Sequence, residues 1–152
     1  MPWRRECFAH VDLSFEVEKV LGKQRHVTTR SGHTYTPAET VRMERYIRSA
    51  FEEKFGRRCA LHDGPVELTV FSTRELAKSN PKYWVGRSDL GKPDEDNVLK
   101  IAQDALNGLA YVDDSQVVDG REVKLPRVAH GSGNTIRIVI DYFKETFQRC
   151  NR

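Results

Sequence analysis

Residues 92–109, KPDEDNVLKIAQDALNGL, join an acidic start to a run in which an apolar residue returns at every third or fourth position. This spacing predicts an amphipathic helix from about Asp96 to about Gly108, with one face buried in a core. The residues of that face are Val98, Ile101, Ala102, Ala105, Leu106 and Leu109. On the opposite stripe, Asp96 and Lys100 lie one helical turn apart, so the helix carries a charged pair away from the core.

The chain before this helix predicts two strands and another helix. Residues 10–19, HVDLSFEVEK, alternate apolar and polar side chains, which is the pattern of a half-buried strand. The tetrapeptide TPAE predicts a helix start, with Thr36 as the N-cap and Pro37 as the first helical residue. Gly56 is expected to end that helix, and residues 66–71, VELTVF, are expected to form the second strand.

The chain after the central helix predicts three more strands. Residues 110–118, AYVDDSQVV, have the composition of a strand interrupted by acids. Residues 121–128 and 135–143, REVKLPRV and TIRIVIDYF, predict a hairpin because the turn residues AHGSGN join them. The order strand, helix, strand, helix and three strands, without an internal repeat, predicts an α+β fold. We therefore expect a single domain over residues 1–152, with a mixed sheet and two main helices.

The composition fits one core and no membrane span. Of the 152 residues, 38% are hydrophobic and 31% are charged. Two aromatic residues of the irregular stretch 72–91, Tyr83 and Trp84, are expected to pack on the core rather than stack on bases. No apolar run approaches the ~18–20 residues of a membrane-spanning helix. The start, MPWRRECFAH, lacks the apolar run of a signal peptide, so we expect a cytoplasmic location.

The three cysteines, Cys7, Cys59 and Cys150, are odd in number and widely spaced, which is typical of reduced thiols in the cytosol. Cys7-x-x-His10 and Cys59-x-x-His62 each have the spacing of half a zinc site. Positions three apart on a strand point to opposite faces, and neither half has the usual loop context. We therefore predict no zinc site.

Basic residues gather in residues 21–36, LGKQRHVTTRSGHTYT, which contain no acid. The whole chain is only mildly basic, with a net charge of +3 and a pI of about 8.8. Because glycine, threonine and tyrosine interleave with Lys23, Arg25 and Arg30, we favour contacts of this loop with phosphates. The alternative is a solvated basic loop without a ligand.

Acidic residues gather at positions 94–96 and again at Asp113 and Asp114. Acids at a helix N-terminus stabilise it, which explains one or two of them. A calcium loop of the EF-hand type is excluded, because its glycine and glutamate places hold Leu99 and Ala105. Carboxylates that converge from the helix start and a neighbouring strand would instead suit Mg²⁺. The pattern alone leaves both a metal site and surface acids open.

Residues 91–126, GKPDEDNVLKIAQDALNGLAYVDDSQVVDGREVKLP, resemble the RusA family of Holliday junction resolvases. The family pattern K-P-D-x-D-N-x-x-K stands at residues 92–100, D-A-L-N/T-G at residues 104–108, and D-D-x-Q-V at residues 113–117. The earlier stretches GKQR and GHTYTPAET also match, so the resemblance runs from about Val11 to Ile140. The chain departs from the family where it has KQRHV in place of KQRPR.

The resemblance implies a homodimeric, Mg²⁺-dependent crossover junction endodeoxyribonuclease, with Mn²⁺ as a substitute ion. Such an enzyme nicks four-way DNA junctions symmetrically in recombination and repair. The resemblance also implies that Asp94, Asp96 and Asp114 are catalytic and bind the metal, with Asp113 assisting. Lys100 is implied to be essential.

The resemblance further implies that DNA is held through its phosphates. Lys23, Arg25 and Arg30 of the basic loop, together with Lys92, would contact the junction arms. Two alternatives remain at this point: a non-catalytic nucleic-acid-binding module, and a nuclease for another branched or single-stranded substrate.

Overall fold

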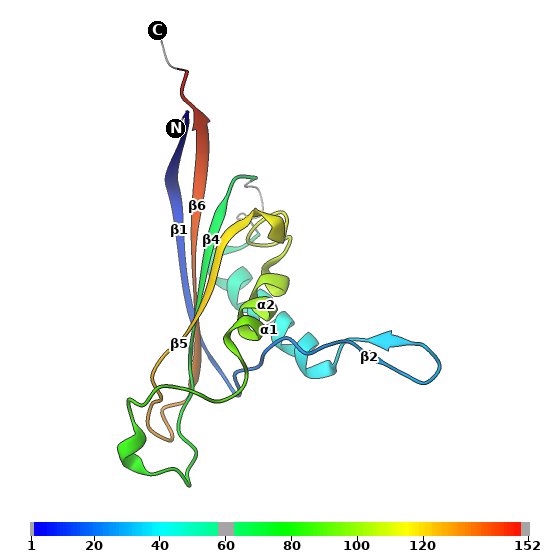
Figure 1. Ribbon diagram of the computed structural model, residues 1–152, viewed down its shortest axis with the longest axis vertical. Coiled ribbons are helices and arrows are strands. Elements are labelled where there is room, and N and C mark those ends of the chain that lie inside the picture. Colours follow the sequence, from blue (N-terminus) through cyan, green and yellow to red (C-terminus); the bar gives the residue numbers. More distant parts are fainter. Residues whose placement is uncertain (1, 58–62, 150–152) are drawn as a thin grey trace.

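Within the described residues, 2–57 and 63–149, the computed structural model has one four-stranded mixed sheet. Its strands, in spatial order, are β1 (Trp3–Val17), β6 (Asn134–Phe147), β4 (Val66–Thr73) and β5 (Val117–Lys124). Neighbours among β1, β6 and β4 are antiparallel, whereas β5 runs parallel to β4 (Figure 1). The predicted α+β fold is confirmed.

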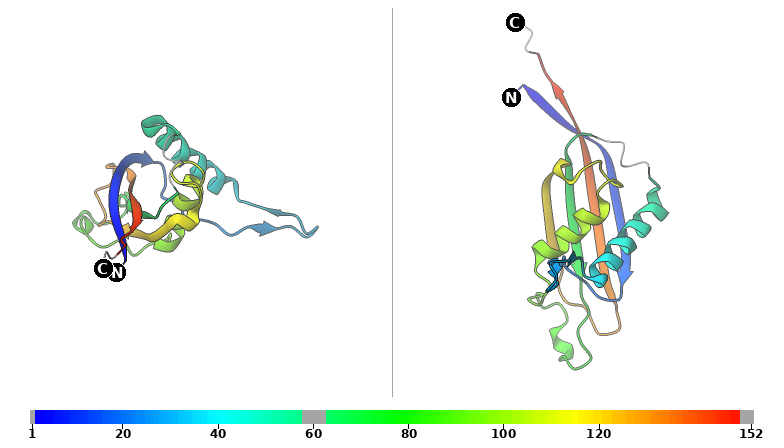
Figure 2. Two further views of the ribbon diagram at one scale, coloured as in Figure 1. Left: turned by 90° about the horizontal axis from the view of Figure 1, so that it is seen from above. Right: turned by 90° about the vertical axis from the view of Figure 1, so that its right-hand side faces the viewer.

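The two α-helices of the described residues, α1 (Ala38–Phe55) and α2 (Glu95–Leu106), cover the same face of the sheet (Figure 2). Every residue predicted for the inner face of α2 is buried, and Ile101 and Leu106 are fully so. These side chains pack with Phe51 of α1 and with Leu68 and Ile138 of the sheet in one hydrophobic core. The path from β4 through α2 to β5 is the crossover that a parallel pair of strands requires. No helix among the described residues is long and apolar enough to span a membrane.

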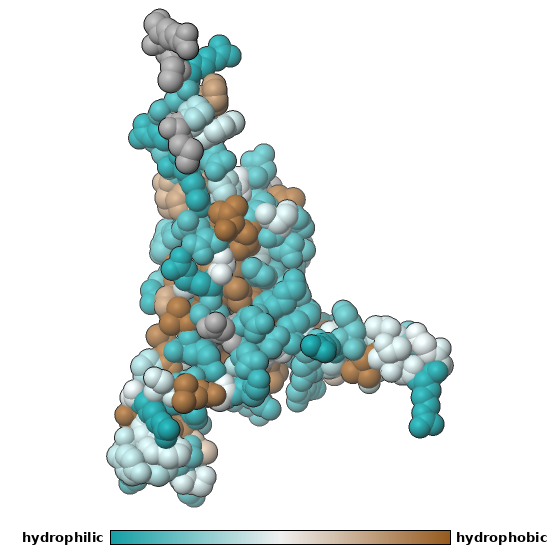
Figure 3. Space-filling view, viewed as in Figure 1, coloured by the Kyte–Doolittle hydropathy of each residue, from teal (hydrophilic) through white to brown (hydrophobic). Residues whose placement is uncertain are grey.

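A short hairpin, β2 (Val27–Thr28) and β3 (Thr34–Tyr35), projects from the body of the molecule (Figures 1 and 2). All four of its strand residues are exposed. The face shown in Figure 3 is largely hydrophilic, and the hairpin extends to the right of it. The basic loop predicted from the sequence therefore becomes an arm that reaches into solvent.

The predicted hairpin between residues 121–128 and 135–143 is wrong, because β4 lies between β5 and β6. The burial of the two strands explains the observed order. β6 buries Ile136, Ile138 and Ile140, so it takes a central position with a partner on each side. Half of the residues of β5 are exposed and one is buried, which suits an edge strand.

The predicted strand at residues 110–118 is also wrong, since β5 begins only at Val117. A short 3₁₀ helix, η3 (Asp114–Gln116), precedes it. The Asp113 side chain accepts a hydrogen bond from the Ser115 N–H at 3.2 Å, and the Gln116 side chain accepts one from the Asp113 N–H at 3.0 Å. This reciprocal pair holds a turn where the alternating pattern predicts a strand.

Two local predictions near α1 and β1 need correction. Pro37, not Thr36, is the N-cap position of α1, and the Thr36 hydroxyl lies 3.1 Å from His26 Nδ1.

Cys7 and His10 do not point to opposite faces of β1, because a bulge lies between Cys7 and Ala9. Cys7 Sγ and His10 Nδ1 both contact Asp141 Oδ1, at 4.0 and 2.5 Å. Cys59, His62 and Cys150 lie outside the described residues.

Tyr83 and Trp84, in the irregular segment 74–91 between β4 and α2, were predicted to pack on the core. The structure does not place them there. Tyr83, in the short 3₁₀ helix η2 (Lys82–Trp84), is 83% exposed. Trp84 is half-buried, and the Arg87 guanidinium lies 4.7 Å from the centre of its ring. Trp84 therefore packs against an arginine of its own segment.

Candidate active site

Asp94 and Asp96, at the start of α2, make contacts other than capping hydrogen bonds. Asp94 is the N-cap residue, yet its carboxylate makes no capping hydrogen bond among the described residues. Both of its oxygens instead lie 2.8 Å from the Lys92 ammonium, and the side chain is 54% exposed. Asp96 is exposed, and its Oδ1 accepts a hydrogen bond from the adjacent Asn97 N–H at 3.0 Å. The interpretation of these residues as capping acids is therefore not supported.

The second acidic pair is brought to the same helix by η3. The buried Tyr111 hydroxyl donates to the Gln103 carbonyl at 2.7 Å, which ties this segment to α2. Burial raises the pKa of Tyr111, so the hydroxyl remains a donor. Asp114 Oδ2 then lies 3.7 Å from the Lys100 ammonium. Asp113 differs from its neighbour, because hydrogen bonds from Ser115 hold it in the turn and lower its pKa.

Lys100 belongs to a chain of alternating charges that crosses the molecule. Its ammonium lies 3.1 Å from Asp104 Oδ1, one helical turn further along α2. Asp104 Oδ2 in turn lies 2.9 Å from the Lys23 ammonium, which also contacts Glu44 of α1 at 2.5 Å. The chain Glu44–Lys23–Asp104–Lys100–Asp114 thus links α1, the 18–26 connection, α2 and η3.

The pKa values in this chain follow from its contacts. Burial alone would raise the pKa of Asp104, but hydrogen bonds from Lys23 and Lys100 more than offset it and lower the pKa below the ordinary value. The hydrogen bond to Asp104 raises the pKa of Lys100. For Lys23, burial acts to lower the pKa, and the hydrogen bonds to Glu44 and Asp104 raise it overall. Lys23, Lys100 and Asp104 are therefore charged near neutral pH.

The four basic residues predicted to bind DNA fall into two groups. Lys23 is only 21% exposed and contacts two carboxylates, so its charge is directed into the protein. Lys92 contacts Asp94 at the surface. Arg25 and Arg30 are exposed on the projecting arm, and neither forms an ion pair within residues 2–57 and 63–149. The arm therefore presents two unpaired guanidinium groups.

The predicted metal ligands are of the right chemical kind but are not gathered around one point. The described side chains contain no group of three or more His, Cys, Asp or Glu that could hold a metal ion. Asp94 and Asp114 each contact a lysine instead. Exposed carboxylates are the oxygen donors that Mg²⁺ prefers, and an ion that keeps several waters needs only a few of them. The donor set at the start of α2 and at η3 therefore fits Mg²⁺ in kind.

A buried ion pair that the sequence does not reveal holds the segment leading into Asp94. Asp89 has no exposed side-chain surface and accepts a hydrogen bond from Arg74 Nε at 2.6 Å. Burial acts to raise the pKa of Asp89, and the Arg74 guanidinium lowers it overall. The same guanidinium donates to the Lys92 carbonyl, and the Lys124 ammonium donates to the Gly91 carbonyl. A single acid in an irregular stretch gives no sequence signal for such an arrangement.

The comparison with known protein families decides what kind of protein carries this site. A family model described as Endodeoxyribonuclease RusA matches residues 18–141, from the end of β1 into β6. The chain belongs to the RusA family. The matched residues include both acidic pairs, Lys100 and the whole charge chain, so the RusA resemblance seen in the sequence is confirmed.

A curated relative of this chain comes from Bacillus subtilis (strain 168), where it is named uncharacterized protein YqaN. It is 37% identical to this chain over 95 residues, which are 57% of this chain and 66% of YqaN. The matched region is thus slightly less than two thirds of the length of YqaN. Its name states no activity, so this likeness does not indicate a particular reaction.

Proposed function

We propose that this chain is a structure-specific endodeoxyribonuclease that resolves four-way DNA junctions by symmetric paired nicking. Membership of the RusA endodeoxyribonuclease family supports the reaction class. The observation that carries the proposal for this chain is the approach of Lys100 to Asp114 at 3.7 Å, which joins α2 to η3 beside exposed acids. A cation that can offset charge on a phosphate, next to carboxylates that can hold a metal ion, can assist phosphodiester hydrolysis.

Asp94, Asp96 and Asp114 would hold Mg²⁺, with Mn²⁺ as a substitute. A bound ion of this kind lowers the pKa of an attacking water and offsets charge on the phosphate. We assign Asp113 to support of the site, because its side chain holds the η3 turn and orients its neighbour Asp114.

Lys100 acts as a fixed positive charge. Asp104 holds its ammonium at 3.1 Å and raises its pKa, so the side chain is a cation at neutral pH and does not serve as a base. A cation at this position stabilises the negative charge that develops on the phosphate in the transition state. Replacing Lys100 by a neutral side chain should lower the cleavage rate about 10²–10³-fold. Removal of other groups that stabilise developing charge has an effect of this size.

The DNA would be held through phosphates on the projecting arm. Arg25 and Arg30 are exposed there, and Lys92 lies beside Asp94. Symmetric nicking requires two identical sites, so we propose a homodimer with two-fold symmetry that matches the junction. Such a pair would place one arm and one acidic site on each half of the substrate.

The test is a cleavage assay in Mg²⁺ on labelled four-way junctions, flaps, single strands and linear duplex. We expect wild-type protein to nick the junction in opposing strands and to leave linear duplex intact. Asp94→Asn should abolish cleavage and retain junction binding, because it removes a carboxylate and no phosphate contact. Asp141→Asn is the matched control, since it removes a carboxylate of β6 on the sheet face away from the helices.

The outcomes separate the alternatives. Binding without cleavage by wild-type protein would indicate a nucleic-acid-binding module. Preferred cleavage of flaps or single strands would indicate a nuclease for another substrate. Full cleavage by Asp94→Asn would contradict the assignment of this carboxylate.

A further inference from the structure

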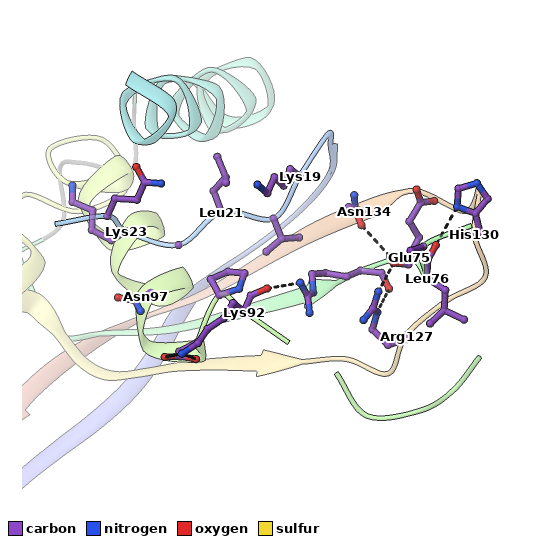
Figure 4. A pocket seen from close by; sticks show the side chains of 17 residues that line it. Lys19, Leu21, Lys23, Glu75, Leu76, Lys92, Asn97, Arg127, His130 and Asn134 are labelled. Carbon is purple, nitrogen blue, oxygen red and sulfur yellow. Dashed lines mark hydrogen bonds and ion pairs between the residues drawn. The ribbon is translucent and has the colours of Figure 1, made fainter. Parts of the chain in front are cut away.

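A groove with a volume of about 610 Å³ opens beside Asp94. Four stretches of chain line it: residues 19–24, residues 74–77, the start of α2 with the residues before it, and residues between 127 and 134. Figure 4 shows Lys92 and Asn97 toward one end and His130 toward the other, with Lys19 and Leu21 along one side. The groove therefore begins at a proposed metal ligand and leads away from it.

The first wall of the groove lies directly on α2. The Lys23 N–H donates to the Asn97 carbonyl at 2.8 Å. A Cβ atom on Gly22 would lie 2.7 Å from Asn97 Cβ and 2.9 Å from Pro93 Cβ, which is closer than such atoms approach. The absence of a side chain at Gly22 thus allows the connection to rest against the helix start, and it fixes this wall.

The opposite wall is held by hydrogen bonds that leave it little freedom. Arg74 binds the buried Asp89, and Arg127 donates to the Glu75 carbonyl at 2.6 Å and to the Arg74 carbonyl at 3.1 Å. The Glu75 carboxylate accepts hydrogen bonds from the Gly131 and Gly133 N–H groups, at 2.8 Å each. The groove is therefore formed before any ligand binds, which lowers the entropy cost of binding.

The side chains that line the groove match the parts of a nucleotide. Lys19 is exposed and forms no ion pair within the described part of the chain, so its ammonium is available to a phosphate. Leu21, which is half-buried, gives apolar surface for a sugar or base. Gln24 is exposed, and its side-chain amide makes no hydrogen bond to another described residue. Nucleic-acid strands are commonly bound by this combination of a cation and apolar surface.

We propose that this groove binds the nucleotide next to the cleaved phosphate, with Lys19 on its phosphate and Leu21 beside its sugar or base. The proposal rests on the function proposed above and extends it. Because Asp94 stands at one end of the groove, a strand whose phosphate is cleaved there has its neighbouring nucleotide at the groove mouth. A base held in this way would contribute to the choice of cleavage sequence.

Two variants test the groove separately from the acidic site. Lys19→Glu reverses the charge of the proposed phosphate contact, and Ala77→Trp fills the groove from an exposed position without disturbing the core. Junction affinity is measured in EDTA by fluorescence anisotropy at several salt concentrations. Lys144→Glu is the matched control, because it is an exposed lysine near the end of β6.

We expect Lys19→Glu to bind the junction about tenfold more weakly. The slope of log affinity against log salt concentration should decrease by about one, as for the loss of one phosphate contact. Ala77→Trp should also weaken binding, and Lys144→Glu should bind as wild type does. A junction that carries a photoreactive base next to the cleavage site should crosslink to residues 19–24 or 74–77.

Wild-type affinity in both groove variants, or crosslinks confined to other segments, would overturn the groove proposal while wild-type cleavage kept the proposed function intact. If wild-type protein bound no branched DNA, the proposed function would fail and the groove proposal would fail with it.

Discussion

Replacing Asp104 by asparagine removes the carboxylate that contacts both Lys23 and Lys100, at 2.9 and 3.1 Å. Asparagine has nearly the same shape, so the change removes charge and little volume. Asp104 is 24% exposed, which places its two contacts between a surface pair and a buried one. We expect the variant to be less stable by about 1–2 kcal/mol, more than for a surface pair and less than for a buried one.

The larger effect should be on cleavage. Without Asp104, the Lys100 ammonium is restrained mainly by Asp114 at 3.7 Å, so it no longer has one fixed position. A displacement of about 1 Å at a reacting group costs about 10²-fold in rate. We therefore expect Asp104→Asn to lower the single-turnover cleavage rate about 10²-fold and to change junction affinity little.

Glu44→Gln is the matched control, because it removes the other carboxylate of Lys23 and does not touch Lys100. It should lower stability to a similar extent and leave the cleavage rate within about threefold of wild type. If Asp104→Asn cleaves as fast as wild type while Lys100→Ala is inactive, Asp104 does not position Lys100. Equal loss of cleavage in both carboxylate variants would attribute the effect to stability alone.

The stability difference between wild type and Asp104→Asn should depend on pH in a defined direction. The pKa of Asp104 is lowered in the folded protein, so its contribution is complete above the ordinary carboxyl pKa of about 4. It is lost as the pH falls through the lowered value, where the carboxylate takes up a proton. Urea unfolding at pH 7 and at pH 3 measures this, and a constant difference would contradict the lowered pKa.

Three further predictions concern the scaffold and the arm. Asp89→Asn should destabilise the protein by about 3–5 kcal/mol at pH 7, because it leaves the half-buried Arg74 without its carboxylate; a thermal midpoint equal to wild type would contradict this. Gly22→Ala should cost about 1–3 kcal/mol through its contact with α2, and unchanged stability in urea would show that the connection can move away. Arg25→Ala and Arg30→Ala should each weaken junction binding and reduce its salt dependence by about one contact at unchanged stability; an unchanged salt dependence in anisotropy would place the phosphates elsewhere.

Local periodicity was sufficient to predict the elements that bury one face by themselves. The spacing of Val98, Ile101 and Leu106 places α2 on the core, and the alternation in residues 10–19 predicts the inner half of β1. Such patterns depend on neighbours within one or two turns, so sequence alone contains them. Strand pairing does not follow from them, and β4 came to lie between two strands that are adjacent in sequence.

The candidate site was predicted in its residue types and only in part in its contacts. The motif identified Lys100 and Asp114, and the structure brings them within 3.7 Å. Lys23 was predicted at a DNA surface because its sequence neighbours are basic, whereas its spatial neighbours are Glu44 and Asp104. Ion pairs between residues distant in the chain depend on the fold, so composition around a residue does not reveal them.

The central claim is that the carboxylates at the start of α2 and at η3 share one divalent cation. The direct test is to measure Mn²⁺ binding to the DNA-free protein. The loss of the free-ion signal in electron paramagnetic resonance reports how much Mn²⁺ is bound. We expect wild-type protein and Asp141→Asn to bind Mn²⁺ with equal affinity. Asp94→Asn and Asp114→Asn should each bind it more weakly, by about tenfold or by a larger factor. Undiminished Mn²⁺ affinity in both of these variants would contradict the claim.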